Sequence, residues 1–178
     1  MCIRDRLMSG AVGTCIAVFP QSRWPLLIVP PFLFLRMALN AIDGMLAREH
    51  GMKSDLGMIL NEVSDVVADA ALYLPFALVD GVHPWLVVVI VVLSIIGEMT
   101  GVVALQICGE RRYDGPMGKS DRAFLFGLLG LLLGCGVTAG VWVTWLLVIA
   151  VGLMTLTIFN RARKALRPAG APSTVDSA

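Results

Sequence analysis

Apolar segments separated by short polar breaks run along most of this chain. They lie at about 7–20, 25–46, 56–79, 84–108, 122–139 and 141–160. A helix needs roughly 20 apolar residues to cross a bilayer, and most of these segments come close to that length. The breaks are rich in proline, glycine and aspartate, which favour turns. The pattern therefore predicts an all-α integral membrane protein, a bundle of about six transmembrane helices with a polar cleft that faces the cytoplasm.

The composition supports this class. Of the 178 residues, 57% are hydrophobic and only 15% are charged, whereas a soluble domain has roughly 25% charged residues. The net charge of +1 says little, because the placement of charge matters more than its sum, and we expect no nucleic-acid partner for a protein of this class. The cysteines show no metal-binding or redox spacing, so we expect no disulfides.

The two ends of the chain differ from its body. Residues 1–6 do not resemble the rest of the chain, and we interpret them as a foreign or truncated N-terminus. Residues 7–165 form one membrane domain, and the small polar residues of 166–178 predict a disordered tail. Basic residues cluster on one side of the predicted spans, at 48–53, 111–122 and 161–167. The positive-inside rule places that side, with both termini, in the cytoplasm of a bacterial-type inner or plasma membrane.

Polar residues interrupt the second and third segments at helical spacing. Asn40 and Asp43 are three residues apart, and Asn61, Asp65 and Asp69 are four apart, so each set shares one helix face. The short connection makes the two helices antiparallel neighbours, whose polar faces can meet. Polar groups at bilayer depth are costly and are seldom kept without a role. Ordinary polar packing between helices explains one or two such residues, but it does not explain the whole series.

These residue types indicate metal-dependent phosphate chemistry. Carboxylates that converge in a low-dielectric cleft repel each other, and a divalent cation relieves that repulsion. Oxygen ligands without histidine or cysteine favour Mg²⁺, Mn²⁺ or Ca²⁺ over zinc. Gly44 and Gly57 would let a ligand approach the backbone closely, and Arg48 could clamp a phosphate.

The same segment resembles the signature of the CDP-alcohol phosphotransferases, Asp-x2-Asp-Gly-x2-Ala-Arg-x8-Gly-x3-Asp-x3-Asp. Its matching positions, all at the required spacing, are Asp43, Gly44, Ala47, Arg48, Gly57 and Asp65. The resemblance extends over residues 7–165. It implies transfer of a phosphatidyl group from a CDP-linked lipid, such as CDP-diacylglycerol, to an alcohol or phosphorylated alcohol. CMP is released, the cofactor is Mg²⁺ or Mn²⁺, and the pathway is phospholipid biosynthesis.

The resemblance also implies roles for individual residues. Asp65 would be the catalytic base. The metal ligands would be Asp43 and Asp65, with help from Asn40, Asn61 and Asp69. The nucleotide and its phosphates would contact Asn40, Asp43, Gly44, Ala47, Arg48, Gly57 and Lys119.

This chain departs from the family pattern at two positions. Asn40 and Asn61 stand where the family has aspartate. A carboxamide can offer one oxygen to a metal but no charge, so the site is expected to hold fewer ions unless a nearby acid such as Glu62 or Asp69 substitutes. The exchange of both residues resembles a bacterial subgroup of the family whose acceptor is unassigned.

A second polar cluster lies at 111–122 on the same predicted side. Its Gly-Pro-x-Gly-Lys turn presents Lys119 to a phosphate or lipid headgroup, although a basic loop that obeys the positive-inside rule would look similar. Glu98, in the fourth segment, is an acid that needs a partner at bilayer depth. Arg36 could pair with it or line the acceptor pocket.

Two other classes of function remain. One is a degenerate family member that binds nucleotide or lipid without turnover. The other is a small transporter, which would spread polar residues over both halves of the membrane, whereas here they crowd one side. The sequence does not identify the acceptor alcohol, and it leaves a homodimer open.

Overall fold

The computed structural model describes residues 3–49, 55–109 and 113–166, and all regular structure within these ranges is helical. The helices are α1 (Ile3–Val18), α2 (Trp24–Glu49), α3 (Asp55–Tyr73), α4 (Pro84–Cys108), α5 (Lys119–Gly134) and α6 (Val141–Ala165), with a short 3₁₀ helix, η1 (Leu74–Leu78). The predicted helical bundle is therefore confirmed, and each apolar segment corresponds to one α-helix.

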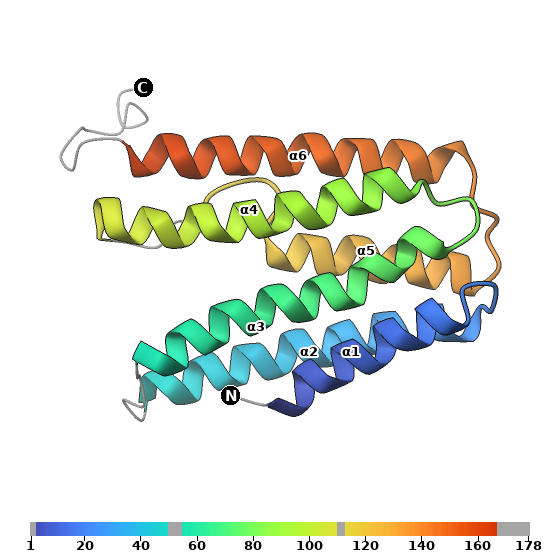
Figure 1. The fold of residues 1–178 in the computed structure, drawn as a ribbon, viewed down its shortest axis with the longest axis horizontal. Coiled ribbons are helices and arrows are strands. Elements are labelled where there is room, and N and C mark those ends of the chain that lie inside the picture. Colours follow the sequence, from blue (N-terminus) through green and yellow to red (C-terminus); the bar gives the residue numbers. More distant parts are fainter. Residues whose placement is uncertain (1–2, 50–54, 110–112, 167–178) are drawn as a thin grey trace, which may run out of the picture.

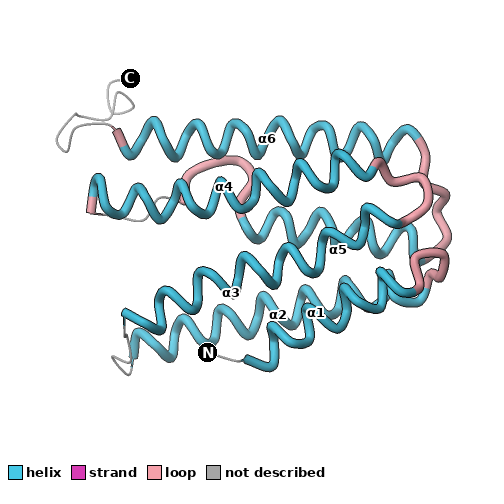
Figure 2. The backbone as a smooth tube through the Cα atoms, viewed as in Figure 1, coloured by secondary structure: helices cyan, strands magenta, loops and turns pink. Residues whose placement is uncertain are grey.

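The helices pack in pairs along the bundle (Figures 1 and 2). The most extensive contacts join α4 to α6, α2 to α5 and α1 to α3. One end of the bundle, on the left in Figure 1, holds the C-terminal ends of α2, α4 and α6. The same end holds the N-terminal ends of α1 and α3. We call this the basic end, because the sequence places its basic clusters beside these helix ends.

Within the described ranges, three helices are long and apolar enough to cross a membrane by length and composition. They contain the stretches Trp24–Ile42, Pro84–Cys108 and Val141–Ala165, and the apolar part of α1, Arg6–Val18, is shorter. Many large apolar side chains on these helices are exposed, for example Ile96 and Val103 on α4. Such a surface suits lipid rather than water, in agreement with the integral membrane class.

The prolines act differently in α2 and α3. Pro75 lies in the first turn of η1, directly after the end of α3. Proline ends an α-helix because it has no N–H to donate to the helical hydrogen-bond pattern and because its ring crowds the preceding turn. Pro30 and Pro31 lie inside α2, which continues past them to Glu49. Gly127 of α5 faces this region closely, since a Cβ built on it would lie 3.9 Å from the Cα atom of Pro30.

The loop before α5 enters the bundle instead of staying at its edge. The N–H of Met117 donates to Oγ1 of Thr157 on α6 at 3.0 Å. A Cβ on Gly115 would come within 2.7 Å of the Cα atom of Thr157, so this close approach requires glycine. Thr157 lies eight residues before the end of α6, which is roughly 12 Å along the helix axis. Helix α5 therefore begins deep in the bundle, with Lys119 at its first position.

The packing of α1 on α3 generates the first prediction. A Cβ on Gly13 would overlap the carbonyl oxygen of Ala71, whereas a Cβ on Gly10, in the same helix, would meet nothing within 4 Å. Gly13→Ala should lower the free energy of unfolding by about 1–3 kcal/mol, because backbone must move to make room. Gly10→Ala should leave it unchanged or slightly higher. Thermal unfolding in detergent measures both, and equal midpoints for the two variants would contradict the packing.

Candidate functional site

Alternating charges link five helices near the centre of the bundle. Nη1 of Arg36 on α2 lies 2.6 Å from Oδ1 of Asp69 on α3. Nη2 of Arg122 on α5 lies 3.4 Å from Oδ2 of Asp69 and 3.0 Å from Oε1 of Glu98 on α4. Nη1 of Arg161 on α6 lies 3.9 Å from Oε2 of Glu98 and donates to the carbonyl oxygen of Gly97 at 2.6 Å. We call Arg36, Asp69, Arg122, Glu98 and Arg161 the charge network.

Four of the five members of the charge network are almost completely shielded from solvent, and the side chain of Glu98 is 15% exposed. Arg36 and Arg122 are 2% exposed, and Asp69 and Arg161 are 3% exposed. Charges buried this deeply are stable only when they are paired, and the loss of one partner leaves an uncompensated charge. The network therefore fixes how α2, α3, α4, α5 and α6 stand relative to one another at this level.

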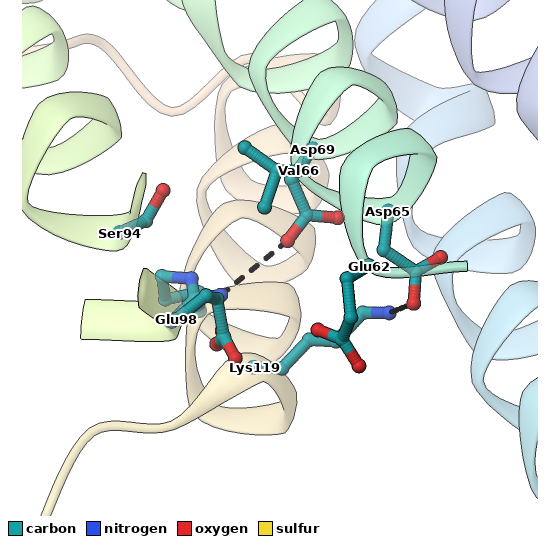
Figure 3. A pocket seen from close by; sticks show the side chains of 8 residues that line it. Glu62, Asp65, Val66, Asp69, Ser94, Glu98 and Lys119 are labelled. Atoms are coloured by element: carbon teal, nitrogen blue, oxygen red, sulfur yellow. Dashed lines mark hydrogen bonds and ion pairs between the residues drawn. The ribbon is translucent and has the colours of Figure 1, made fainter. Parts of the chain in front are cut away.

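Asp65, one turn before Asp69 on α3, faces Lys119. Nζ of Lys119 lies 2.8 Å from Oδ2 of Asp65 (Figure 3). Nη2 of Arg6 on α1 lies 3.8 Å from Oδ1 of Asp65 and donates to Oδ1 of Asn61 at 3.3 Å. Asp65 is ten residues into α3, or roughly 15 Å from the start of that helix. The deep entry of the loop before α5 is what allows Lys119 to reach it.

The pair of Arg36 and Asp69 also sets the register between α2 and α3. Because these helices run antiparallel (Figure 1), the position four residues after Arg36 stands opposite the position four residues before Asp69. By this register Asn40 lies level with Asp65, and the turn of Asp43 lies level with Asn61. In the described residues, however, the main packing partner of α2 is α5 and that of α3 is α1, so a meeting of the two motif faces stays a prediction.

Several predicted site residues fall at the edge of what the structure describes. Asp43, Gly44, Ala47 and Arg48 lie in the last turns of α2, and their side chains are outside the described part of the structure. Gly57 lies in the first turn of α3 and is exposed. The roles predicted for these residues stay predictions.

A small pocket opens between α3, α4 and α5 (Figure 3). It has a volume of about 30 Å³, and its charged lining residues are Glu62, Asp65, Asp69, Glu98, Lys119 and Arg122. A volume of this size holds a water molecule, an ion or the end of a small polar molecule, but not a nucleotide. The lining contains more carboxylates than cations.

The structure gives Arg36 a partner other than the Glu98 that the sequence offered as one of two possibilities, and it adds two residues. Arg36 pairs with Asp69 rather than with Glu98, and the partners of Glu98 are Arg122 and Arg161. In the sequence, these two arginines stood out only as basic residues that flank predicted spans. Arg122 could have been found, because it follows Lys119 by three residues and therefore shares its face of α5. No comparable signal marks Arg161.

The described side chains supply some of the oxygen ligands that a hard divalent cation needs. Among the described residues no three His, Cys, Asp or Glu side chains gather to hold a metal, but Asp43 is not among the described side chains. Asp65, Asn61 and Asn40 offer oxygen atoms, which Mg²⁺ and Mn²⁺ prefer. Nδ2 of Asn40 is buried without a hydrogen-bond partner, and turning this amide over would present its oxygen there instead. Both oxygens of Asp69 face arginines, so its help to a metal stays a prediction.

Comparisons with known proteins identify the class. The sequence profile of the CDP-alcohol phosphatidyltransferase family matches residues 6–157. The chain is 46% identical over 140 residues to the "Inner membrane protein YnbA" of Escherichia coli (strain K12). The aligned region covers 79% of this chain and 70% of that protein. No solved structure gives a significant match. The chain therefore belongs to the CDP-alcohol phosphatidyltransferase family, a family of phosphotransferase enzymes that transfer a phosphatidyl group from a CDP-alcohol.

The charge network generates the second prediction. Asp69→Ala leaves Arg36 and Arg122 without their shared carboxylate, and it should lower the free energy of unfolding by roughly 3–5 kcal/mol. Lys164→Ala is the control, because it breaks a partly exposed pair with Asp114 at 2.6 Å and should cost less than about 1 kcal/mol. Thermal unfolding in detergent compares the two. Similar losses of stability would contradict the structural role of the network.

Proposed function

We propose that this protein transfers a phosphatidyl group from a CDP-linked lipid such as CDP-diacylglycerol to an alcohol, releasing CMP, in phospholipid biosynthesis. The observation that carries the proposal is the contact of Lys119 with Asp65 at 2.8 Å. It joins a phosphate-binding type of turn to the last aspartate of the family motif, although 54 residues separate them in the sequence. A carboxylate and a cation placed together at one end of a membrane bundle suit phosphoryl transfer to an alcohol.

The donor would lie over the connection between α2 and α3. Gly44, Ala47 and Gly57 leave room for the nucleotide against the backbone, and Arg48 would stand near the pyrophosphate. Asp43 and Asp65 would hold Mg²⁺ or Mn²⁺, with the amide oxygens of Asn40 and Asn61 and with assistance from Asp69. We expect one tightly held ion, because two asparagines remove half the negative charge of a four-aspartate site. Such a cation neutralises charge on the pyrophosphate.

In the chemical step, Asp65 would accept the proton of the acceptor hydroxyl. The hydroxyl oxygen forms a bond to the phosphorus that carries the lipid, and the bond from that phosphorus to the bridging oxygen of the pyrophosphate breaks. CMP leaves with the bridging oxygen. Alcohols are weak nucleophiles at neutral pH, so a positioned base accelerates this step. Lys119 would hold the carboxylate of Asp65 towards the acceptor.

The membrane orientation follows from the distribution of charge. The motif residues lie on the parts of α2 and α3 towards the basic end, and Lys119 contacts Asp65 there. The positive-inside rule would assign this end to the cytoplasm. Polar residues gathered towards one end argue against a transporter. Asn40 and Asn61 favour one alternative, a family member that binds CDP-lipid without turnover.

Release of CMP tests the function. Purified protein with CDP-diacylglycerol, Mg²⁺ or Mn²⁺ and a panel of alcohols should release CMP. Asp43→Ala should abolish the release, because the remaining carboxylate leaves the cation under-neutralised. Binding of CDP-lipid without release of CMP, for every alcohol and metal, would favour the non-catalytic alternative. Release that persists in Asp43→Ala would refute the metal site.

Asp65→Asn separates the role of base from that of ligand. If Asp65 is the base, binding of metal and CDP-lipid should persist while turnover falls by about 10²-fold or more. Equilibrium binding and CMP release, measured on the same preparation, give the two quantities. Loss of metal and turnover together would make Asp65 a ligand first and would move the base to Glu62 or Asp69.

A further inference from the structure

An apolar groove lies between α2 and α5, on the outside of the bundle. It has a volume of about 330 Å³, and of the described residues that line it only Ser120 is polar. Phe34 on α2 and Phe124 on α5 belong to the lining and are 79% and 71% exposed, so they stand at its mouth. In a membrane-spanning bundle this mouth opens onto the hydrocarbon tails of the bilayer. The groove therefore suits a long apolar group.

The groove exists because α2 and α5 separate along their length. A Cβ built on Gly134 would lie 2.7 Å from a side-chain atom of α2, and one on Gly130 would lie 2.9 Å from a backbone oxygen of α2. On Gly127 the nearest atom of α2 is 3.7 Å away, which is ordinary contact. The two helices are thus pressed together at the end of α5 far from Lys119, and the space between them widens towards Lys119.

The wide end of the groove lies beside the charged site. Ser120 directly follows Lys119, whose Nζ lies 2.8 Å from Oδ2 of Asp65. From Ser120 to Leu131, which also lines the groove, α5 rises roughly 16 Å. One leaflet fills half of a hydrocarbon core that is roughly 30 Å thick. The groove therefore runs from the site over a length that matches the tails of one leaflet.

The reacting phosphorus of a CDP-linked lipid is joined through glycerol to two acyl chains. When that phosphorus lies beside Asp65, the chains have to leave the site towards the bilayer, and the groove starts there. We propose that the groove binds one acyl chain of the donor and that Gly127 leaves the room for it. A chain packed along the groove gains many small dispersion contacts, and holding it there helps to orient the phosphorus for attack. This inference rests on the proposed function and adds a subsite for the lipid tail.

Photolabelling tests where the chain lies. CDP-diacylglycerol with a photoreactive diazirine midway along one acyl chain is bound to the purified protein in Mg²⁺ and irradiated, and the labelled residues are identified by mass spectrometry. Label should concentrate on groove residues such as Leu128 and Leu131, and excess CDP should reduce it severalfold. Ile149 and Leu156 are the internal control, because they are exposed on α6, which packs mainly on α4. Their labelling, by lipid that is not held at the site, should not respond to CDP.

A matched pair of glycine variants tests the role of Gly127. Gly127→Leu places a side chain in the groove and should raise the dissociation constant for CDP-diacylglycerol by about tenfold or more, since overfilling a packed site commonly costs that much. Its affinity for CDP, which has no tail, should stay unchanged. Gly152→Leu is the control, because Gly152 is exposed on α6 and a Cβ there meets nothing within 4 Å. It should leave both affinities unchanged.

The outcomes separate this inference from the proposed function. Groove labelling that is equal with and without CDP would mean that the groove holds bulk lipid, and an unlabelled groove would mean that something else covers it, such as a second copy of the chain. Either result, or equal affinities of the two variants for CDP-diacylglycerol, would overturn the inference and leave the proposed function standing. If Gly127→Leu does not fold, labelling of the unaltered protein decides. Absence of saturable binding of CDP-diacylglycerol would overturn the proposed function, and this inference with it.

Discussion

Buried charge must be paired, and this requirement organises the bundle. Helices that face lipid gain little from apolar contact with one another, because lipid is equally apolar, so directional interactions carry more of the specificity. Here α2, α3, α4, α5 and α6 each contribute a charged side chain to one network around Asp69 and Glu98. None of these five helices can slide along its neighbours without separating a charged pair, and the site beside the network inherits that fixed geometry.

Two features place the proposed site residues relative to this network. The contact of Arg36 with Asp69 joins α2 to α3, and counting one turn from it along each helix brings Asn40 level with Asp65. The loop before α5, held to Thr157, starts that helix deep in the bundle and carries Lys119 to Asp65. Arg122 lies three residues after Lys119, so one helix face of α5 serves both the network and the site. The charges of the network and the charges proposed for catalysis are therefore adjacent but use different partners.

The sequence predicted the features that depend on local spacing. It located the six helices, the shared face of Asn61, Asp65 and Asp69, and the family to which the chain belongs. It did not predict which charges pair across helices, because spacing along a helix defines a face but not the helix opposite. For this reason the sequence left Arg36 between a pair with Glu98 and a place in the acceptor pocket, and it showed Arg161 only as a residue of a basic flank. The depth of Lys119 depends on the close packing of Gly115 on Thr157, which only the folded chain reveals.

A divalent cation shared by Asp43 and Asp65 would tie the motif on α2 to the charges on α3, and its position can be measured directly. Anomalous scattering from crystals grown with Mn²⁺ and CDP locates and counts the ions. One strong peak between α2 and α3, within coordination distance of Asp43 and Asp65, is the predicted result. No peak beside Asp65, or two fully occupied ions ligated through Asn40 and Asn61, would contradict the account.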